Sequence, residues 1–449
     1  MTQLAMPPRA LLALAEAKVP RYTSYPTAAQ FGPLGEAQYR AWLAQGIRPA
    51  DPLSLYLHVP FCRDLCWYCA CHTRPTRSEA RLSAYTDALM AEMALLDAAL
   101  PAHAGVSHLH FGGGTPSILG ADGLRRLMAR LRGLFGLRPG AEVAIELDPR
   151  LMDVALVDAL GEMGVTRASL GVQDITPDIQ ARIGRPQPAE LVQLGVERLR
   201  QAGIAGINLD LMYGLPGQTV AHVEASARFA ASLRVDRIAV FGYAHVAWMK
   251  PQQKAIDEAT LPDVVERLEQ AEAAEAVLRA SGYVALGLDH FALPDDTMAQ
   301  AARAGRLRRN FQGYTIDDAP ALIGLGASSI GALPSGFAQN EADERQYIAS
   351  VAAGRLPIRR GIATTHEDRV RALLIERLMC DFALDLRAVP MDIVSPALER
   401  LQQLVEARLV DIQNGNLLVA PEGRRFVRQI AVCFDAYFEA GAQRHSMAI

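Results

Sequence analysis

The sequence predicts an α/β fold: a partial parallel (β/α)6 barrel of the TIM type, preceded by an N-terminal arm and followed by a mainly helical, winged-helix-like domain. Three observations predict it. From residue 51 onward, short β-rich runs alternate with helical patterns, which is typical of right-handed βαβ units. This alternation stops near residue 360, and helical patterns followed by a hairpin take over. We therefore expect an arm at 1–50, a barrel with a C-terminal extension at 51–360, and a helical domain at 361–449.

In the arm, the segment Pro20–Thr27 is rich in proline and polar residues, so we expect an ordered loop there. Six β-rich runs then predict six strands. They are Ser54–Phe61, Val106–Phe111, Glu142–Leu147, Arg167–Val172, Ile207–Tyr213 and Arg237–Tyr243. Between the strands, leucines and methionines recur every three or four residues, as in the stretches 82–100 and 124–134. Such stripes are typical of helices that pack on a sheet.

In the C-terminal domain, the β-runs Leu409–Gln413 and Asn416–Ala420 flank Asn414-Gly415, which predicts a hairpin. We expect a helix over Glu422–Phe438 after it. Helices on both sides of a hairpin suggest a winged helix, a shape often associated with DNA. The segment has few basic residues, however, so a lid or packing role is the better interpretation.

The composition excludes several classes of function. The chain has 449 residues, 50% of them apolar and 21% charged, as in ordinary folded proteins. Its formal net charge of −4 provides no positive field for nucleic acid or an anionic membrane surface. No apolar stretch reaches the roughly 20 residues that cross a bilayer. We therefore expect a cytoplasmic protein that binds neither nucleic acid nor membrane.

Four of the six cysteines lie within the segment 62–71. In a reducing compartment, such crowding favours metal binding over disulfides. Cys62, Cys66 and Cys69 have the spacing C-x3-C-x2-C directly after the first predicted strand, where barrels hold their active sites. Thiolates suit zinc or an iron–sulfur cluster. One compact loop with three thiolates can hold three corners of a cubane and leave the fourth iron open to another ligand.

This loop, with an aromatic residue at Tyr68, resembles that of the radical S-adenosylmethionine (SAM) superfamily. The resemblance implies a radical SAM barrel and a [4Fe–4S] cluster on Cys62, Cys66 and Cys69. The free iron would be chelated by the amino and carboxylate groups of SAM. The glycines of Gly112–Pro116, which follow the second predicted strand, fit the loop that contacts the amino group of this cofactor.

Most of the chain also resembles the family of oxygen-independent coproporphyrinogen III oxidases. The matching segments are PRYTSYPTA at 20–28, LSLYLHVPFC at 53–62, HFGGGTPS at 110–117, IELDPR at 145–150, LGVQD at 170–174, NLDLMYGLPGQT at 208–219, FGYAH at 241–245, LDHFALPDD at 288–296 and RNFQGYT at 309–315. The related haem-carrying chaperones lack a fourth cysteine and this arm, whereas this chain has both. Ala70 replaces a glycine common in the family.

The resemblance implies an oxidoreductase of haem biosynthesis that works without oxygen. A 5′-deoxyadenosyl radical removes hydrogen from the propionates of rings A and B of coproporphyrinogen III. Each propionate then loses carbon dioxide and becomes a vinyl group, which gives protoporphyrinogen IX. The resemblance further implies a monomer, two bound SAM molecules, and an electron donor such as a flavodoxin or a ferredoxin. The arm and the C-terminal domain are expected to cover the barrel mouth.

The resemblance also implies roles for individual residues, beyond the three cluster ligands. The first SAM would be contacted by Tyr56, Gly113, Glu146 and Ile330, and the second by Tyr68, Gly114, Thr115, Gln173, Arg185, Asp210 and Ala244. Cys71 and His58 are candidate catalytic residues. Arg21, Arg308 and Arg309, with Gln312, are candidates for binding the propionates of the substrate, since arginine forks suit carboxylates.

Alternatives remain for some of these roles. Cys71 can be a structural thiol, His58 a hydrogen-bonded core histidine, and Arg185 a surface cation, while Cys380 and Cys433 are expected in apolar cores. At the level of function, the alternatives are a haem-binding chaperone of the same superfamily and a zinc-bearing regulatory protein.

Overall fold

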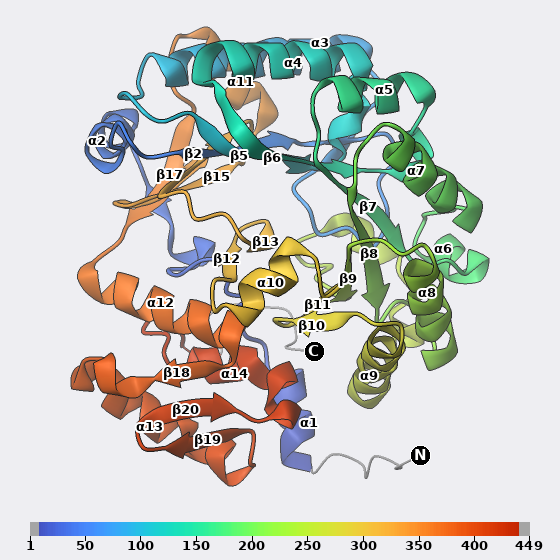
Figure 1. The fold of residues 1–449 in the computed structure, drawn as a ribbon, viewed down its shortest axis with the longest axis vertical. Coiled ribbons are helices and arrows are strands. Elements are labelled where there is room, and N and C mark those ends of the chain that lie inside the picture. Colours follow the sequence, from blue (N-terminus) through green and yellow to red (C-terminus); the bar gives the residue numbers. More distant parts are fainter. Residues whose placement is uncertain (1–8, 440–449) are drawn as a thin grey trace.

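The computed structural model describes residues 9–439, and within them a sheet of 13 strands forms the centre of the molecule (Figure 1). Six parallel strands lie side by side in chain order. They are β2 (Leu53–Val59), β5 (Val106–Gly113), β6 (Leu137–Leu147), β7 (Arg167–Gln173), β8 (Gly206–Tyr213) and β9 (Arg237–Gly242). The six strands predicted from the sequence are therefore confirmed, in the predicted parallel arrangement.

The sheet extends beyond these six strands at both edges. Next to β2, a further parallel strand, β14 (Ala321–Leu325), precedes antiparallel β15 (Ile330–Leu333) and β16 (Gly336–Asn340). This edge ends with β17 (Ile358–Ala363) and the short β1 (Gly32–Pro33). At the other edge, β9 pairs with β11 (His290–Ala292) and then β10 (Val284–Leu286). The strand β14 was missed, because it returns from far along the chain to pair with the first strand of the barrel.

Helices pack on the outer face of the parallel strands (Figure 1). They are α3 (Glu79–Asp97), α4 (Gly120–Phe135), α5 (Val154–Glu162), α6 (Pro177–Arg182), α7 (Ala189–Gln201), α8 (Val220–Ser232) and α9 (Val264–Ala280). The predicted apolar stripes face the sheet, since Leu89, Met93, Leu127 and Leu131 are almost fully buried. Two further helices, α10 (Thr297–Arg303) and α11 (Glu344–Ala352), belong to the extension after β9.

The C-terminal part combines helices with a small sheet of three strands. Its elements are α12 (His366–Asp381), β18 (Ala383–Asp385), α13 (Met391–Glu406), β19 (Val410–Gln413), β20 (Asn416–Val419) and α14 (Val427–Val432). The predicted hairpin is confirmed, with positive φ at both turn residues, Asn414 and Gly415. The single helix expected over Glu422–Phe438 is wrong: a 3-10 helix, Pro421–Phe426, precedes the short α14. There, Gly423 lies directly against the backbone of Leu409, which constrains the chain.

The N-terminal arm packs against this C-terminal part. The loop at 20–27 is non-helical, as predicted, and lies between α1 (Arg9–Glu16) and α2 (Glu36–Gly46). Tyr22 and Tyr25 share an apolar core with residues of α12–α14, and Figure 1 shows α1 beside these elements. The Tyr22 hydroxyl donates to Asp435 at 2.9 Å. The proposed domain boundaries stay a prediction, and residues 1–8 and 440–449 lie outside the described part of the chain.

None of the helices described in residues 9–439 has the length and apolar character needed to cross a membrane.

Candidate active site

The cysteine loop lies at the carboxyl end of β2, where the sequence predicted it. Its two ends are joined by the short strands β3 (Phe61–Cys62) and β4 (Arg74–Pro75). Three side chains from the segment after β9 hold its backbone. The Lys250 ammonium donates to the Cys71 carbonyl at 2.7 Å, and the amides of Gln252 and Gln253 donate to the carbonyls of Cys69 (2.7 Å) and Tyr68 (2.8 Å). The loop is therefore fixed from the opposite side of the barrel.

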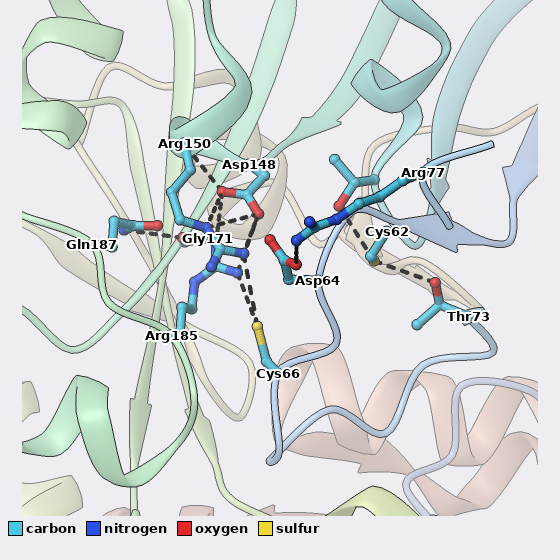
Figure 2. A network of polar contacts seen from close by, with 11 residues as sticks. Cys62, Asp64, Cys66, Thr73, Arg77, Asp148, Arg150, Gly171, Arg185 and Gln187 are labelled. Atoms are coloured by element: carbon cyan, nitrogen blue, oxygen red, sulfur yellow. Dashed lines mark hydrogen bonds and ion pairs between the residues drawn. The ribbon is translucent and has the colours of Figure 1, made fainter. Parts of the chain in front are cut away.

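Hydrogen-bond donors surround the cysteine sulfurs (Figure 2). The Arg185 guanidinium donates to the Cys66 sulfur at 3.3 Å and to the Gly171 carbonyl at 2.7 Å, and it pairs with Asp148 at 3.4 Å. The Cys62 sulfur lies 3.3 Å from the Thr73 hydroxyl and 3.4 Å from that of Thr115. Donors of this kind stabilise thiolates and tune the potential of a cluster that they bind.

The electrostatics of the loop favour anionic sulfur at one position. A hydrogen bond from Cys71 and the positive charges of Lys250 and Arg185 lower the pKa of Cys69 to about 7, against the effect of burial. Burial raises the pKa of Cys62, which the hydroxyls of Thr115 and Thr73 partly offset. A bound metal would lower both further.

The donor set fits a cluster better than a single metal ion. Within the described residues, no three His, Cys, Asp or Glu side chains converge where one ion could bind them. A [4Fe–4S] cluster does not require the ligands to converge on one point, because each thiolate binds its own iron. One loop supplies three such thiols, those of Cys62, Cys66 and Cys69, and hydrogen-bond donors lie at their sulfurs. The same loop would leave the fourth iron to another ligand.

The glycine loop at the end of β5 has no room for side chains. A Cβ at Gly112 would lie 2.6 Å from the Glu146 carboxylate, and one at Gly113 would lie 2.7 Å from the ring of His58. Gly113 also has a φ of +116°, which favours glycine, and its N–H donates to Glu146 at 3.2 Å. The close approach of Glu146 and His58 therefore requires glycine at both positions, and it brings these two side chains against the backbone at the end of β5.

Glu146, His58 and Tyr56 surround the glycine loop. Burial raises the pKa of Glu146, but the hydrogen bond from His110 at 3.1 Å, together with that from Gly113, outweighs it and lowers the pKa. His58 donates from Nε2 to the His72 carbonyl (3.0 Å), so its Nδ1 accepts from the Tyr56 hydroxyl (2.9 Å). Burial lowers the pKa of His58 to about 4, so the ring is neutral at pH 7. These contacts match the alternative of a hydrogen-bonded core histidine.

Among the residues expected to contact a second SAM, Arg185 and Thr115 lie beside the cysteine sulfurs, and Gly114 continues the glycine loop. Asp210 projects into the barrel, where it accepts hydrogen bonds from Ser169 (2.9 Å) and Asn208 (2.8 Å). Burial raises its pKa to about 6. Gln173 ends β7 with a φ of +69°, a left-handed conformation that is rare outside glycine. No feature of the sequence indicates this conformation.

A cavity of about 420 Å³ adjoins the cysteine loop, and exposed Cys71 and Ala244 both line it. The candidate substrate residues Arg21, Arg309 and Gln312 line it as well. Arg308, in contrast, is exposed on β12 (Arg308–Asn310) and is not part of the wall. A second cavity of about 300 Å³ shares Phe241, His290 and Gln312 with the first and contains Glu146 and Asp210. Ile330 begins β15, directly after a turn that contacts the end of β2.

Sequence reasoning missed several cationic residues of this cavity. Arg267 of α9 and Arg425 and Arg428 of the C-terminal part also line it. Burial lowers the pKa of Arg428 to about 9, and the nearby charges of Arg21 and Arg309 contribute to this effect. Crowded cations of this kind favour anionic ligands. The only available signal was the arginines themselves, which lie on helices and in loops far apart in the sequence.

The comparison with known proteins agrees with this geometry. Residues 56–230 match the model of the radical SAM superfamily, which implies a [4Fe–4S] cluster and SAM. The chain is 46% identical to the oxygen-independent coproporphyrinogen III oxidase of Bradyrhizobium diazoefficiens, over 97% of this chain and 98% of the relative. It is 38% identical to the Escherichia coli K12 enzyme of the same name, over 94% of each chain.

A solved structure shows the same fold over nearly the whole chain. Coproporphyrinogen III oxidase (HemN) from Escherichia coli, a radical SAM enzyme, matches with a TM-score of 0.90 and 37% identity. The match covers 97% of this chain and 100% of that one. The predicted resemblance is therefore confirmed, and the chain belongs to the family of oxygen-independent coproporphyrinogen III oxidases within the radical SAM superfamily.

Proposed function

We propose that the protein converts two propionate side chains of coproporphyrinogen III, on rings A and B, into vinyl groups without oxygen and so forms protoporphyrinogen IX. The observation that carries the proposal is the arginine-lined cavity beside the cysteine loop, because Cys71 belongs to both. The name shared by relatives that span nearly the full chain supports the same substrate. When bound, the cluster and SAM would supply the radical that removes hydrogen from the propionate; carbon dioxide is then released, and an external one-electron acceptor takes up the remaining electron.

The residues of this chain bind the substrate and exclude water from it. Arg21 and Arg309 offer guanidinium groups to the carboxylates of the substrate, and the crowding of cations around Arg428 increases the attraction. Arg309 is held in place by its hydrogen bond to the Tyr22 carbonyl at 3.1 Å and by the face of Tyr314. The arm that supplies Arg21 and Tyr22 is itself tied to the C-terminal part. We propose that both act as covers that exclude water and oxygen.

The cofactor site is proposed to hold two SAM molecules. Tyr56, Gly113, Glu146 and Ile330 would contact the one at the open iron. The second would lie near Tyr68, Gly114, Thr115, Gln173, Arg185, Asp210 and Ala244. Support comes from Asp210: a buried carboxylate with a raised pKa favours a partner that donates hydrogen bonds. Cys71 lines the substrate cavity, which supports an active role without making it a cluster ligand.

The electron donor, such as a flavodoxin or a ferredoxin, the monomeric state and the cytoplasmic location stay predictions.

The proposed reaction is tested by incubating the cluster-loaded protein with coproporphyrinogen III, SAM and a reductant without oxygen. We expect protoporphyrinogen IX, with methionine and 5′-deoxyadenosine as coproducts. A protein that binds haem tightly but forms no vinyl product would instead be a haem-binding chaperone. Colourless protein that contains zinc and no iron would contradict the cluster itself.

A further inference from the structure

Asp289 places a carboxylate in the wall of the arginine-lined cavity. The residue directly precedes β11, and its carbonyl accepts a hydrogen bond from the Val240 N–H at 2.8 Å, which fixes it to the edge of the barrel sheet. Its carboxylate accepts a hydrogen bond from Nδ1 of His290 at 2.6 Å. The His290 ring is in turn packed edge-on against Phe241 and Tyr314. The position of the carboxylate is therefore set by rigid neighbours.

This carboxylate differs from the other acid in the wall. Glu275 is engaged in ion pairs with Arg279 (2.7 Å) and Arg425 (3.4 Å). Within residues 9–439, the carboxylate of Asp289 accepts a hydrogen bond only from His290, which leaves acceptor capacity toward the cavity. Burial raises the pKa of Asp289, but His290, Arg309 and Arg21 outweigh this effect and lower it, so the group is an anion at neutral pH.

A porphyrinogen presents two kinds of polar group. Its carboxylates accept hydrogen bonds, and arginine side chains, which are donors only, suit them. Its four pyrrole N–H groups are donors, and no arginine can bind them. A cavity that recognises both kinds of group needs at least one acceptor among its cations, and Asp289 is a fixed, ionised acceptor in this wall.

We propose that Asp289 binds the centre of the tetrapyrrole by accepting hydrogen bonds from its pyrrole N–H groups, while the arginines bind the propionates. The inference rests on the proposed substrate and adds the residue that distinguishes the reduced macrocycle from its oxidised form. The saturated bridges of a porphyrinogen let its N–H groups turn out of the mean plane toward one carboxylate. The oxidised porphyrin is flat, and its two N–H groups point to the centre of the ring. Both forms carry the same four propionates.

The test measures binding rather than turnover. Coproporphyrin III is fluorescent, so it serves as the reporter ligand, and coproporphyrinogen III displaces it from the cluster-loaded protein under anaerobic conditions. We expect the native protein to prefer the porphyrinogen. In Asp289→Asn, porphyrinogen binding should weaken about 10- to 100-fold, as expected for loss of a charge-assisted hydrogen bond, while porphyrin binding changes little. Glu275→Gln, which alters the other acid of the same wall, should keep the preference.

The outcomes separate this inference from the proposed function. Equal weakening of both ligands in Asp289→Asn, or no weakening, would overturn the role of Asp289. If either result is found, Asp289→Ala, which removes the carboxylate altogether, should also still prefer the porphyrinogen over the porphyrin. If the native protein binds neither tetrapyrrole, the proposed substrate is wrong, whatever Asp289 does. Arg309→Met is the positive control, because loss of a propionate contact should weaken both ligands alike.

Discussion

Glu92 of α3 is a buried carboxylate whose titration we expect to control part of the stability of the protein. Glu92 is 2% exposed, and within the described residues its pKa is set by burial and by neutral hydrogen-bond donors, with no cation among them. One oxygen accepts hydrogen bonds from the Gly326 N–H (2.7 Å) and the Tyr347 hydroxyl (2.6 Å), and the other from Asn340 (2.6 Å). These bonds fix the turn after β14 that leads to Ile330, a proposed contact of the first SAM.

Burial raises the pKa of Glu92 from 4.5 to about 7, and the three hydrogen bonds only partly offset it. The folded protein thus holds the proton of this carboxyl more tightly than the unfolded chain does. The contribution of the protonated Glu92 carboxyl to the free energy of unfolding is complete below pH 4.5 and is lost as the pH rises through 7. With 1.36 kcal/mol for each pKa unit, the loss between pH 5 and 8 is about 2–3 kcal/mol. For 449 residues this corresponds to a Tm change of about 3 °C.

The assay compares thermal unfolding of the native protein and of Glu92→Gln from pH 5 to 8. Glutamine does not titrate, so the difference between the two isolates this carboxyl from all other groups. Between pH 5 and pH 8, we expect the Tm of the native protein to fall by about 3 °C relative to the Tm of the variant. Glu79→Gln, an exposed carboxylate of the same helix, serves as the control and should follow the native curve. A constant difference between Glu92→Gln and the native protein would refute the reasoning.

Four further predictions concern the site. Cys66→Ser should lose cluster iron, SAM cleavage and oxidase activity together, whereas Cys71→Ser should lose activity but keep its iron; a colourless Cys71→Ser protein would show that the ligands are assigned wrongly. Deletion of residues 1–30 should abolish vinyl formation while the cluster still assembles, and unchanged turnover would refute the role of the arm as a cover. Arg185→Met removes the nearer of the two guanidinium donors at the Cys66 sulfur and should lower the reduction potential of the cluster in redox titration, so an unchanged potential would contradict that contact. Arg309→Met should raise KM for the porphyrinogen about tenfold or more, and an unchanged KM would exclude it from propionate binding.

The parts of the structure that follow from local patterns could be predicted from the sequence. The six parallel strands, the cysteine loop at the end of the first and the hairpin at Asn414-Gly415 each depend on residues close together in the chain. The parallel pairing of β14 with β2 does not, since nothing in the segment 321–325 indicates its partner. The 3-10 start of the segment at 421–426, where we expected an α-helix, accompanies a contact of Gly423 with Leu409 that local patterns do not indicate.

For the site, the family resemblance indicated which residues to consider, and only the structure shows which of them lie close together. Arg21 and Arg309 line one cavity, whereas Arg308 is exposed and is not part of its wall, although it neighbours Arg309 in sequence. Arg428 was missed because it lies in a part of the chain that the alternation of strands and helices does not include. Glu92 was missed because it sits next to an apolar stripe on α3, where a lone acid looks like part of the solvated face.

The central claim is that three thiolates leave one iron of the cluster free to bind SAM, and electron paramagnetic resonance tests it most directly. The protein is reconstituted without oxygen, reduced, and measured before and after SAM is added. We predict the signal of a reduced [4Fe–4S] cluster whose g-values shift on addition of SAM, and no such cluster in Cys66→Ser. A cluster signal that SAM leaves unchanged would contradict the account.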